Sequence, residues 1–444
     1  MKKITDYLSP PRVLVLGFAT IILLGAVLLT FPIATEDGRG LPFLDGLFTA
    51  TSATCVTGLV VVDTADTFST FGEAVILILI QIGGLGFMTF ATFLFLLLGK
   101  KISLKGRLLL MESYNDFSMG GLVRLAKRIL IFTALVETFG SILLAIRFSF
   151  DMPIGKAIYY GLFHAVSNFN NAGFDIMGGF RSLTGYVADP LVTLTVCSLI
   201  IIGGIGFMVV NDLFEYRYTH RLSLHSKAVL VVTATLLIAG TALIFIFEYG
   251  NAKTLAPLSG TGKFLGSLFQ AVTTRTSGAA TLPIGDLANP TLFLMIMLMF
   301  IGAGSGSTAG GIKVSTFAVL MASMWSQMKG KEEVVLFKRR IVGSTILKAM
   351  TVGMCGMGIV IVVTMLLSIT DPGYDFIRYL FEATSAFGTV GLTMGITPDL
   401  SPVGRILIIL TMFAGRLGPL TISFALAKKD KDVLHYPKGK IMIG

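Results

Sequence analysis

Residues 47–58 read LFTATSATCVTG, and this stretch has three counterparts further along the chain. Residues 162–173 read LFHAVSNFNNAG, residues 268–278 read LFQAVTTRTSG, and residues 380–391 read LFEATSAFGTVG. Each copy begins with Leu-Phe-polar-Ala and ends on a glycine, and the four final glycines are 115, 105 and 113 residues apart. Four matches to one template at nearly constant spacing indicate a fourfold internal repeat.

The composition places these copies in a membrane protein. Of the 444 residues, 54% are hydrophobic and only 14% are charged, whereas soluble domains carry about 25% charged residues. A membrane-spanning helix needs about 20 apolar residues, and eight stretches meet that length. The predicted spans cover approximately residues 13–32, 74–99, 129–147, 191–211, 228–247, 287–312, 349–370 and 406–427.

Each short copy falls between two predicted spans and is too brief to cross a membrane. We therefore expect each repeat to be a span, a re-entrant half-helix with an extended strand, and a second span (an M1-P-M2 unit). The predicted fold is an all-α membrane protein with eight transmembrane helices around a pseudo-fourfold, potassium-channel-like pore. The expected units are repeat 1 (10–100), repeat 2 (124–215), repeat 3 (226–328), repeat 4 (341–428) and a cytoplasmic tail (429–444).

The net charge of +10 is distributed as a membrane orientation predicts, and not as a nucleic-acid-binding face. Basic residues gather in alternate loops, and the loops between them lean acidic. By the positive-inside rule, the basic loops and both termini lie in the cytoplasm. The basic clusters include Lys100, Lys101, Lys105 and Arg107; Arg217, Arg221 and Lys227; Lys329, Lys331, Lys338, Arg339 and Arg340; and Lys428, Lys429 and Lys431.

The glycine that ends each copy suggests an ion-binding backbone. Glycine adopts conformations that turn successive carbonyls the same way, and rings of carbonyls can replace the water around a potassium ion. No ring of Asp or Glu accompanies these glycines, so charge-based selection of divalent ions is not expected. The predicted selectivity filter consists of Val56, Thr57 and Gly58; Asn171, Ala172 and Gly173; Thr276, Ser277 and Gly278; and Thr389, Val390 and Gly391.

Residues 300–316, FIGAGSGSTAGGIKVST, look at first like a phosphate-binding loop. That motif requires Gly-Lys-Ser/Thr after its spacer, and here the lysine comes one place late and follows a membrane span. Glycine and hydroxyl residues break transmembrane helices, and the freed backbone must then line a cavity. We expect a glycine-rich intramembrane loop over 302–313 that crosses the pore beneath the filter, although a mere packing kink is the alternative.

Small residues also recur in the second span of each repeat, in IGGLGF (82–87), IGGIGF (202–207), IGAGSG (301–306) and AGRLGP (414–419). Such residues allow close helix packing in membranes. Arg416 in the last of these is costly at membrane depth, by about 2.5–3.5 kcal/mol, and so should face the protein interior or water. A buried pair with an acid such as Glu137 is one explanation for it.

The loops TSATCVTGL, FNNAGF, RTSG and SAFGTVGLTMG resemble the four filter loops of the Trk/Ktr/HKT superfamily of potassium transporters. GAGSGSTAGGIK and AGRLGPLT are similar to the bacterial KtrB-type membrane subunits of Ktr potassium uptake systems, and the resemblance covers about residues 10–440. The third loop departs from the pattern, because RTSGAA has no aromatic residue after its glycine. A serine in place of the first glycine is associated with sodium transport in plant relatives, so Gly58 points to potassium.

The resemblance implies roles for the remaining residues. It makes Arg416 a positive barrier in the pore and the glycine-rich loop an intramembrane gate. The gate residues are Gly302, Ala303, Gly304, Ser305, Gly306, Ser307, Thr308, Ala309, Gly310, Gly311 and Lys313.

The resemblance also implies partners. It predicts a homodimer in the bacterial cell membrane and a cytosolic RCK nucleotide-binding ring (KtrA-type) on the basic inner loops. ATP or ADP would then bind to the ring and not to this chain. Whether sodium activates transport or is coupled to it stays open.

Two other functions are compatible with a polytopic chain. A sodium-coupled potassium symporter with alternating access would share the potassium substrate, but parallel repeats around one axis favour a pore. A membrane-embedded enzyme would need catalytic polar residues within the spans, and these hold few besides Glu137 and Arg416. We expect no enzymatic activity.

Overall fold

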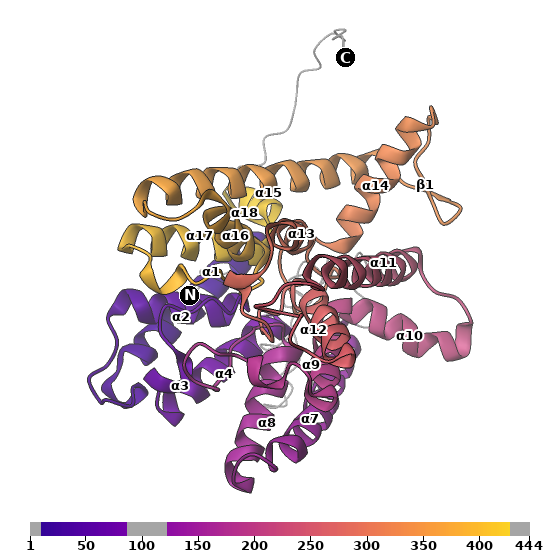
Figure 1. The fold of residues 1–444 in the computed structure, drawn as a ribbon. Coiled ribbons are helices and arrows are strands. Elements are labelled where there is room, and N and C mark those ends of the chain that lie inside the picture. The colour runs from indigo at the N-terminus through magenta and orange to yellow at the C-terminus, as the bar shows by residue number, and fades with distance from the viewer. Residues whose placement is uncertain (1–9, 87–121, 427–444) are drawn as a thin grey trace.

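The computed structural model describes residues 10–86 and 122–426, and these form an almost wholly helical protein (Figure 1). Residues 87–99 of the second predicted span and the predicted tail 429–444 lie outside the described residues. The described elements are α1 (Pro10–Thr30), η2 (Pro32–Ala34), α2 (Phe43–Cys55), α3 (Thr64–Thr67), α4 (Thr70–Leu85), α7 (Leu122–Phe148), α8 (Ile154–Phe169), η3 (Thr184–Tyr186), α9 (Pro190–Ile205), α10 (Phe207–Thr219), α11 (Leu224–Glu248), α12 (Gly260–Thr273), η4 (Ile284–Asp286), α13 (Asn289–Phe300), α14 (Val314–Met328), β1 (Val335–Leu336), β2 (Arg339–Arg340), α15 (Gly343–Thr370), α16 (Phe376–Gly388), η5 (Thr397–Asp399), α17 (Pro402–Leu417) and α18 (Pro419–Leu426).

The repeated sequence forms a short helix in each quarter of the chain: α2, α8, α12 and α16, here called the pore helices. The phenylalanine and the alanine of each Leu-Phe-polar-Ala motif are completely or almost completely buried. They are Phe48 and Ala50, Phe163 and Ala165, Phe269 and Ala271, and Phe381 and Ala383. Burial of these two side chains explains why the motif recurs, because each pore helix is anchored in the protein interior by the same residues.

The four quarters pack in a closed circle. Each pore helix lies against the long helix before it, in the pairs α1–α2, α7–α8, α11–α12 and α15–α16. The helix that follows each pore helix contacts the pore helix of the next quarter, in the pairs α4–α8, α9–α12 and α13–α16, and α17 returns to α2. Figure 1 shows the pore helices arranged in chain order around the middle of the molecule.

The helix that completes each repeat after its pore helix is here called the second helix: α4, α9, α13 or α17. Polar caps fix where these second helices begin. Asp189 accepts hydrogen bonds from the backbone N–H groups of Leu191 and Val192, at 3.0 and 3.1 Å, and Pro190 occupies the first position of α9. Ser401 caps α17 in the same way through Gly404. These caps satisfy helix N–H groups that have no partner within the helix.

The same second helices end at a common break. Gly86, Gly206 and Gly418 all have a left-handed backbone, with φ of 83°, 104° and 83°. At Gly206 the chain turns by 93° between α9 and α10. The predicted spans 191–211 and 406–427 are therefore each divided at this glycine, where the sequence predicts only close helix packing.

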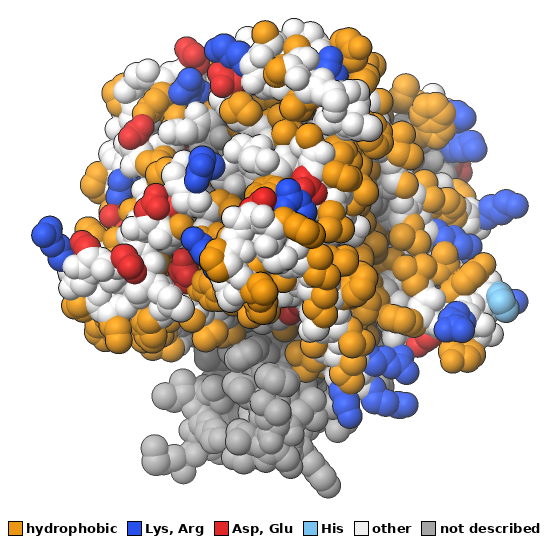
Figure 2. All heavy atoms as spheres, turned by 60° about the horizontal axis from the view of Figure 1, so that its bottom comes forward, with side chains coloured by type: hydrophobic (Ala, Val, Ile, Leu, Met, Phe, Trp, Pro, Cys, Tyr) orange, Lys and Arg blue, Asp and Glu red, His pale blue; other side chains and the backbone are white. Residues whose placement is uncertain are grey.

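The surface and helix lengths suit a membrane. Among the described helices, α1, α7, α11 and α15 are long and apolar enough to span one, and the bent α9–α10 pair would be a fifth span. Large side chains on these four helices are exposed, such as Leu24, Leu135, Ile238 and Met354, at 61, 65, 72 and 74%. Figure 2 shows hydrophobic side chains over much of the visible face. Because α4 and α13 are shorter, the expected count of eight spans stays a prediction.

Candidate functional site

The four glycines that end the repeated stretches meet at the centre of the circle. A Cβ built on Gly58 would lie 3.2 Å from the Cα of Gly173, and one built on Gly173 would lie 2.9 Å from the Cα of Gly278. The series continues from Gly278 to Gly391 at 3.1 Å and returns from Gly391 to Gly58 at 3.0 Å. The four glycines therefore form a closed ring in chain order.

Only glycine fits in this ring. A side chain at any of the four positions would collide with the carbonyl oxygen of the residue that precedes the next glycine, namely Ala172, Ser277, Val390 or Thr57. The glycine φ angles are 91°, 66°, 81° and 91°, a conformation that other residues rarely adopt. The structure thus places one carbonyl from each repeat directly against the neighbouring repeat.

The backbone before each glycine is also unusual. The residue two places earlier has a left-handed φ in every repeat: 57° at Val56, 59° at Asn171, 77° at Thr276 and 50° at Thr389. Such conformations are genuine outliers for β-branched residues, cost of order 1–3 kcal/mol each, and cluster at functional sites. Alternation of positive and negative φ can aim successive carbonyls to one side, as an ion-binding filter needs.

A hydroxyl residue on each pore helix holds this backbone in place. In repeats 1 and 4, the N–H of the ring glycine donates to a serine: Gly58 to Ser52 Oγ at 3.0 Å, and Gly391 to Ser385 Oγ at 3.1 Å. Both serines are fully buried. The hydroxyl therefore satisfies a donor that would otherwise be orphaned in the interior.

In repeats 2 and 3 the equivalent hydroxyl donates a hydrogen bond instead of accepting one. Ser167 Oγ donates to the carbonyl of Phe174 at 2.6 Å, and Thr273 Oγ1 donates to the carbonyl of Ala279 at 2.5 Å. The sequence analysis did not select these residues, although Ser or Thr stands at the sixth position of all four repeated stretches. In all four repeats the peptide carbonyl at this sixth position also accepts the N–H of the residue before the glycine, at 2.8–3.0 Å.

The ring has no fixed charge of its own. Glu382 on α16 is fully buried, but its carboxylate accepts hydrogen bonds from Thr393 Oγ1 at 2.7 Å and Thr397 Oγ1 at 2.5 Å. Each pore helix ends one to three residues before the predicted filter residues of its repeat, so the carbonyl ends of the four helices bring partial negative charge close to the ring. Neutral oxygens and helix dipoles suit a monovalent cation that sheds its water.

The glycine-rich loop lies directly against the predicted filter. It connects α13 to α14, and a bridge between Ile301 and Ile312 brings its two ends together. A Cβ built on Gly310 would lie 2.7 Å from Cγ2 of Thr389, one of the predicted filter residues.

Its backbone also reaches the neighbouring repeats. Gly304 N–H donates to the carbonyl of Gly204 at 2.8 Å, and Gly311 N–H donates to that of Gly415 at 3.2 Å. The loop therefore joins repeats 2 and 4 next to the ring.

Two half-buried cations hold the loop by its carbonyls. Lys313 Nζ donates to the carbonyls of Ala309 and Gly310, at 2.6 and 3.2 Å. Arg416 donates to the carbonyl of Thr308 in the loop and to that of Gly83 in repeat 1. The pairing of Arg416 with Glu137 does not occur. Glu137 instead accepts hydrogen bonds from Gln81 at 3.2 Å and Asn170 at 3.0 Å.

Comparison with known proteins gives a consistent match over the whole chain. The family model of TrkH, cation transport protein, matches residues 18–435. The chain is 45% identical over 438 residues to the Ktr system potassium uptake protein B of Bacillus subtilis (strain 168), covering 98% of this chain and 97% of that protein. It is 40% identical over 449 residues to the potassium/sodium uptake protein NtpJ of Enterococcus hirae, covering 100% and 99%.

A solved structure has the same fold. The potassium transporter TrkH from Vibrio parahaemolyticus superposes with a TM-score of 0.74 over 96% of this chain and 87% of its own, at 17% sequence identity. At that identity the likeness concerns the fold alone.

Substitution of Ser52 tests the support of the ring. In Ser52→Ala the buried N–H of Gly58 loses its acceptor, which should cost about 1–3 kcal/mol and lower the thermal unfolding temperature of the purified protein in detergent. Thr49→Val is the matched control, because the Thr49 hydroxyl lies buried on the same helix and makes no hydrogen bond. Equal losses of stability in the two variants would contradict the role assigned to Ser52.

Proposed function

The chain belongs to the TrkH family of cation transport proteins, and from this membership we propose that it carries potassium into the cell through the glycine ring. The membership confirms both the resemblance to the Trk/Ktr superfamily and the prediction of a transporter instead of an enzyme. It also makes the protein a multi-pass membrane protein.

One observation carries the proposal: Gly58, Gly173, Gly278 and Gly391 close a ring, each against a carbonyl of the next repeat. Carbonyl rings of this kind coordinate dehydrated potassium in channels. The relatives' names, which refer to potassium uptake, support potassium as the ion. We assign the filter to the three residues that end each repeated stretch, from Val56–Gly58 in repeat 1 to Thr389–Gly391 in repeat 4.

The proposed architecture is four M1-P-M2 repeats with eight spans and a pseudo-fourfold axis through the ring. The circular packing of the pore helices against successive quarters supports this arrangement. The repeat boundaries predicted from the sequence belong to the same proposal, as do cytoplasmic termini and a location in the bacterial cell membrane.

The gate of this pathway is the loop from Gly302 to Lys313. Its contacts with Thr389 and with repeats 2 and 4 support a position across the conduction path, and not a simple packing kink. Arg416 adds a positive charge at the same place and would slow the passage of cations. Potassium would move passively down its electrochemical gradient whenever the loop moves aside.

Regulation is proposed to come from outside the chain. The chain would act as a homodimer on a cytosolic RCK ring of the KtrA type, which binds ATP or ADP and docks on the basic inner loops. The names of relatives as parts of a Ktr system support a partner subunit. Sodium activation fits a relative named for potassium/sodium uptake. If potassium flux required sodium in fixed stoichiometry, a symporter would replace the pore.

Growth of a potassium-uptake-deficient bacterium on low potassium tests the filter. The wild-type gene should restore growth, whereas Gly391→Asp should abolish it and Gly58→Ser should reduce it, because a side chain at either position collides with a carbonyl of the ring. Gly358→Ser is the control, since no atom of residues 10–86 or 122–426 lies within 4 Å of the Cβ it would add. Full growth with both ring variants would contradict the filter assignment.

Flux through vesicles tests the barrier. Without the partner ring, Arg416→Ala should conduct potassium faster than the wild-type protein, because the variant lacks both a positive charge in the path and a hydrogen bond to the gate loop at Thr308. Arg128→Ala, which removes an exposed arginine beside Glu215, should leave the flux unchanged. Equal or slower flux in Arg416→Ala would exclude the barrier role.

A further inference from the structure

Arg275 is a buried arginine near the gate to which the proposed mechanism gives no role. It follows α12, the pore helix of repeat 3, and its side chain is 6% exposed. None of the ion pairs formed by the described residues includes it. A charged side chain at membrane depth is expensive, and its presence there points to function.

The guanidinium of Arg275 reaches the start of the gate loop. Its Nη2 lies 3.5 Å from the carbonyl oxygen of Gly302, the first glycine of the loop. This is the one hydrogen bond that its side chain makes to any described residue, and Nε is buried without a partner. Arg275 thus joins the end of the pore helix of repeat 3 to the junction between α13 and the loop, which would be the hinge of the proposed gate.

The other repeats make the equivalent connection through backbone alone. In those repeats the eighth residue of the repeated stretch, which matches Arg275, presents its backbone carbonyl to a glycine of the second helix. A Cβ added to this glycine would collide with that carbonyl. The three pairs are Thr54 with Gly83, Phe169 with Gly203, and Phe387 with Gly415. In repeat 3 a Cβ on Gly302 would instead meet the carbonyls of Gly310 and Ile312, within the loop itself. The long side chain of Arg275 therefore replaces a fixed backbone contact with a breakable one.

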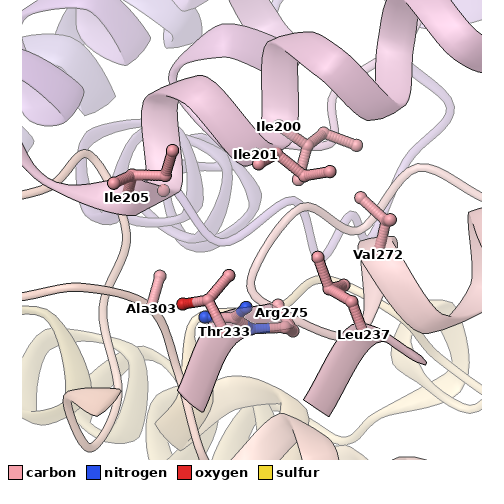
Figure 3. Close-up of a pocket in the computed structure, with 9 residues that line it drawn as sticks. Ile200, Ile201, Ile205, Thr233, Leu237, Val272, Arg275 and Ala303 are labelled. Atoms are coloured by element: carbon pink, nitrogen blue, oxygen red, sulfur yellow. The ribbon is translucent and has the colours of Figure 1, made fainter. Parts of the chain in front are cut away.

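A small cavity adjoins this contact (Figure 3). The space in which the centre of a water molecule could move is about 10 Å³. That is close to the minimum that one buried water molecule needs. Arg275 and Thr233 both line it, together with Ala303, the second residue of the gate loop. The hydroxyl of Thr233 and Nε of Arg275 are both buried and form no hydrogen bond with any residue that the structure describes. Two buried polar groups without a partner therefore line one cavity of about the size of a water molecule.

We propose that Arg275 is a positioning residue that holds the hinge of the gate loop closed, with one water molecule shared between it and Thr233. The proposal rests on the gate role given above to residues 302–313. A guanidinium removed from bulk water must keep its acceptors. Displacement of Gly302 would take away the carbonyl that Arg275 binds and would move Ala303 from the cavity wall, so the closed loop is favoured. A neutral apolar side chain imposes no such requirement.

The test combines potassium flux with chemical labelling of the loop in vesicles that contain the purified chain without its partner. Ser307→Cys in a Cys355→Ser background provides a thiol in the gate, since the other two cysteines, Cys55 and Cys197, are buried. Arg275→Met should raise both the flux and the rate of reaction with a water-soluble thiol reagent about tenfold, as expected for loss of one hydrogen bond to a charged donor. Thr233→Val should raise both by a smaller factor, and Arg275→Lys should stay close to the wild-type values.

Arg147→Met is the control, because Arg147 forms its ion pairs with Asp151 and Asp189 at the far end of repeat 2 and should affect neither readout. If Arg275→Met changes neither flux nor labelling while Arg416→Ala raises the flux, the proposal is wrong and the gate stands. If neither variant changes either readout, the gate assignment itself is wrong. Should Arg275→Met fail to fold, Thr233→Val decides, and an unchanged labelling rate in that variant overturns the proposal.

Discussion

Backbone that is not helical cannot face hydrocarbon, because its N–H and C=O groups would have no partner there. The loops that end at Gly58, Gly173, Gly278 and Gly391 meet this constraint by facing one another. The circular packing of four helix groups follows from it, because a single loop of this kind would leave polar groups exposed at membrane depth. The hydroxyls of Ser52 and Ser385 complete the arrangement by accepting the two glycine N–H groups that point away from the ring.

The third repeat departs from the other three in ways that belong together. Its repeated stretch is one residue shorter, its second helix stops at Phe300, and its pore helix is followed by an arginine. In repeats 1, 2 and 4 a glycine packs directly on a pore-helix carbonyl, which ties the second helix firmly to the ring. Repeat 3 lacks this tie, and the chain there forms the loop that lies against Thr389. Repeats 1, 2 and 4 thus share one way of packing on the ring, and repeat 3 supplies the loop that we propose as the gate.

The sequence predicted the pore helices well, because each one buries a phenylalanine at the same place in a short repeated motif. These residues are Phe48, Phe163, Phe269 and Phe381. It also predicted a loop over 302–313, rich in glycine and hydroxyl residues that disfavour a helix, and the structure ends α13 at Phe300 and begins α14 at Val314. It could not identify the partners of Arg416, since the carbonyls that it binds are 108 and 333 residues away and no side-chain pattern marks them. The sixth-position hydroxyls were missed for a different reason. Ser and Thr are common in apolar helices, and only comparison of the four copies shows that this position always carries one of these two residues.

The opposite hydrogen-bonding sense of the sixth-position hydroxyls has one more consequence. The carbonyls of Phe174 and Ala279 are occupied by Ser167 and Thr273, whereas no described donor reaches the equivalent carbonyls of Leu59 and Leu392. Repeats 4 and 1 are neighbours in the circle, so the uncommitted oxygens gather on one half of it. In the proposed filter, an arriving ion would therefore meet more uncommitted carbonyl oxygens on the side of repeats 4 and 1 than on the side of repeats 2 and 3. Four identical chains around an axis would present the same oxygens on every side, whereas four unequal repeats within one chain do not.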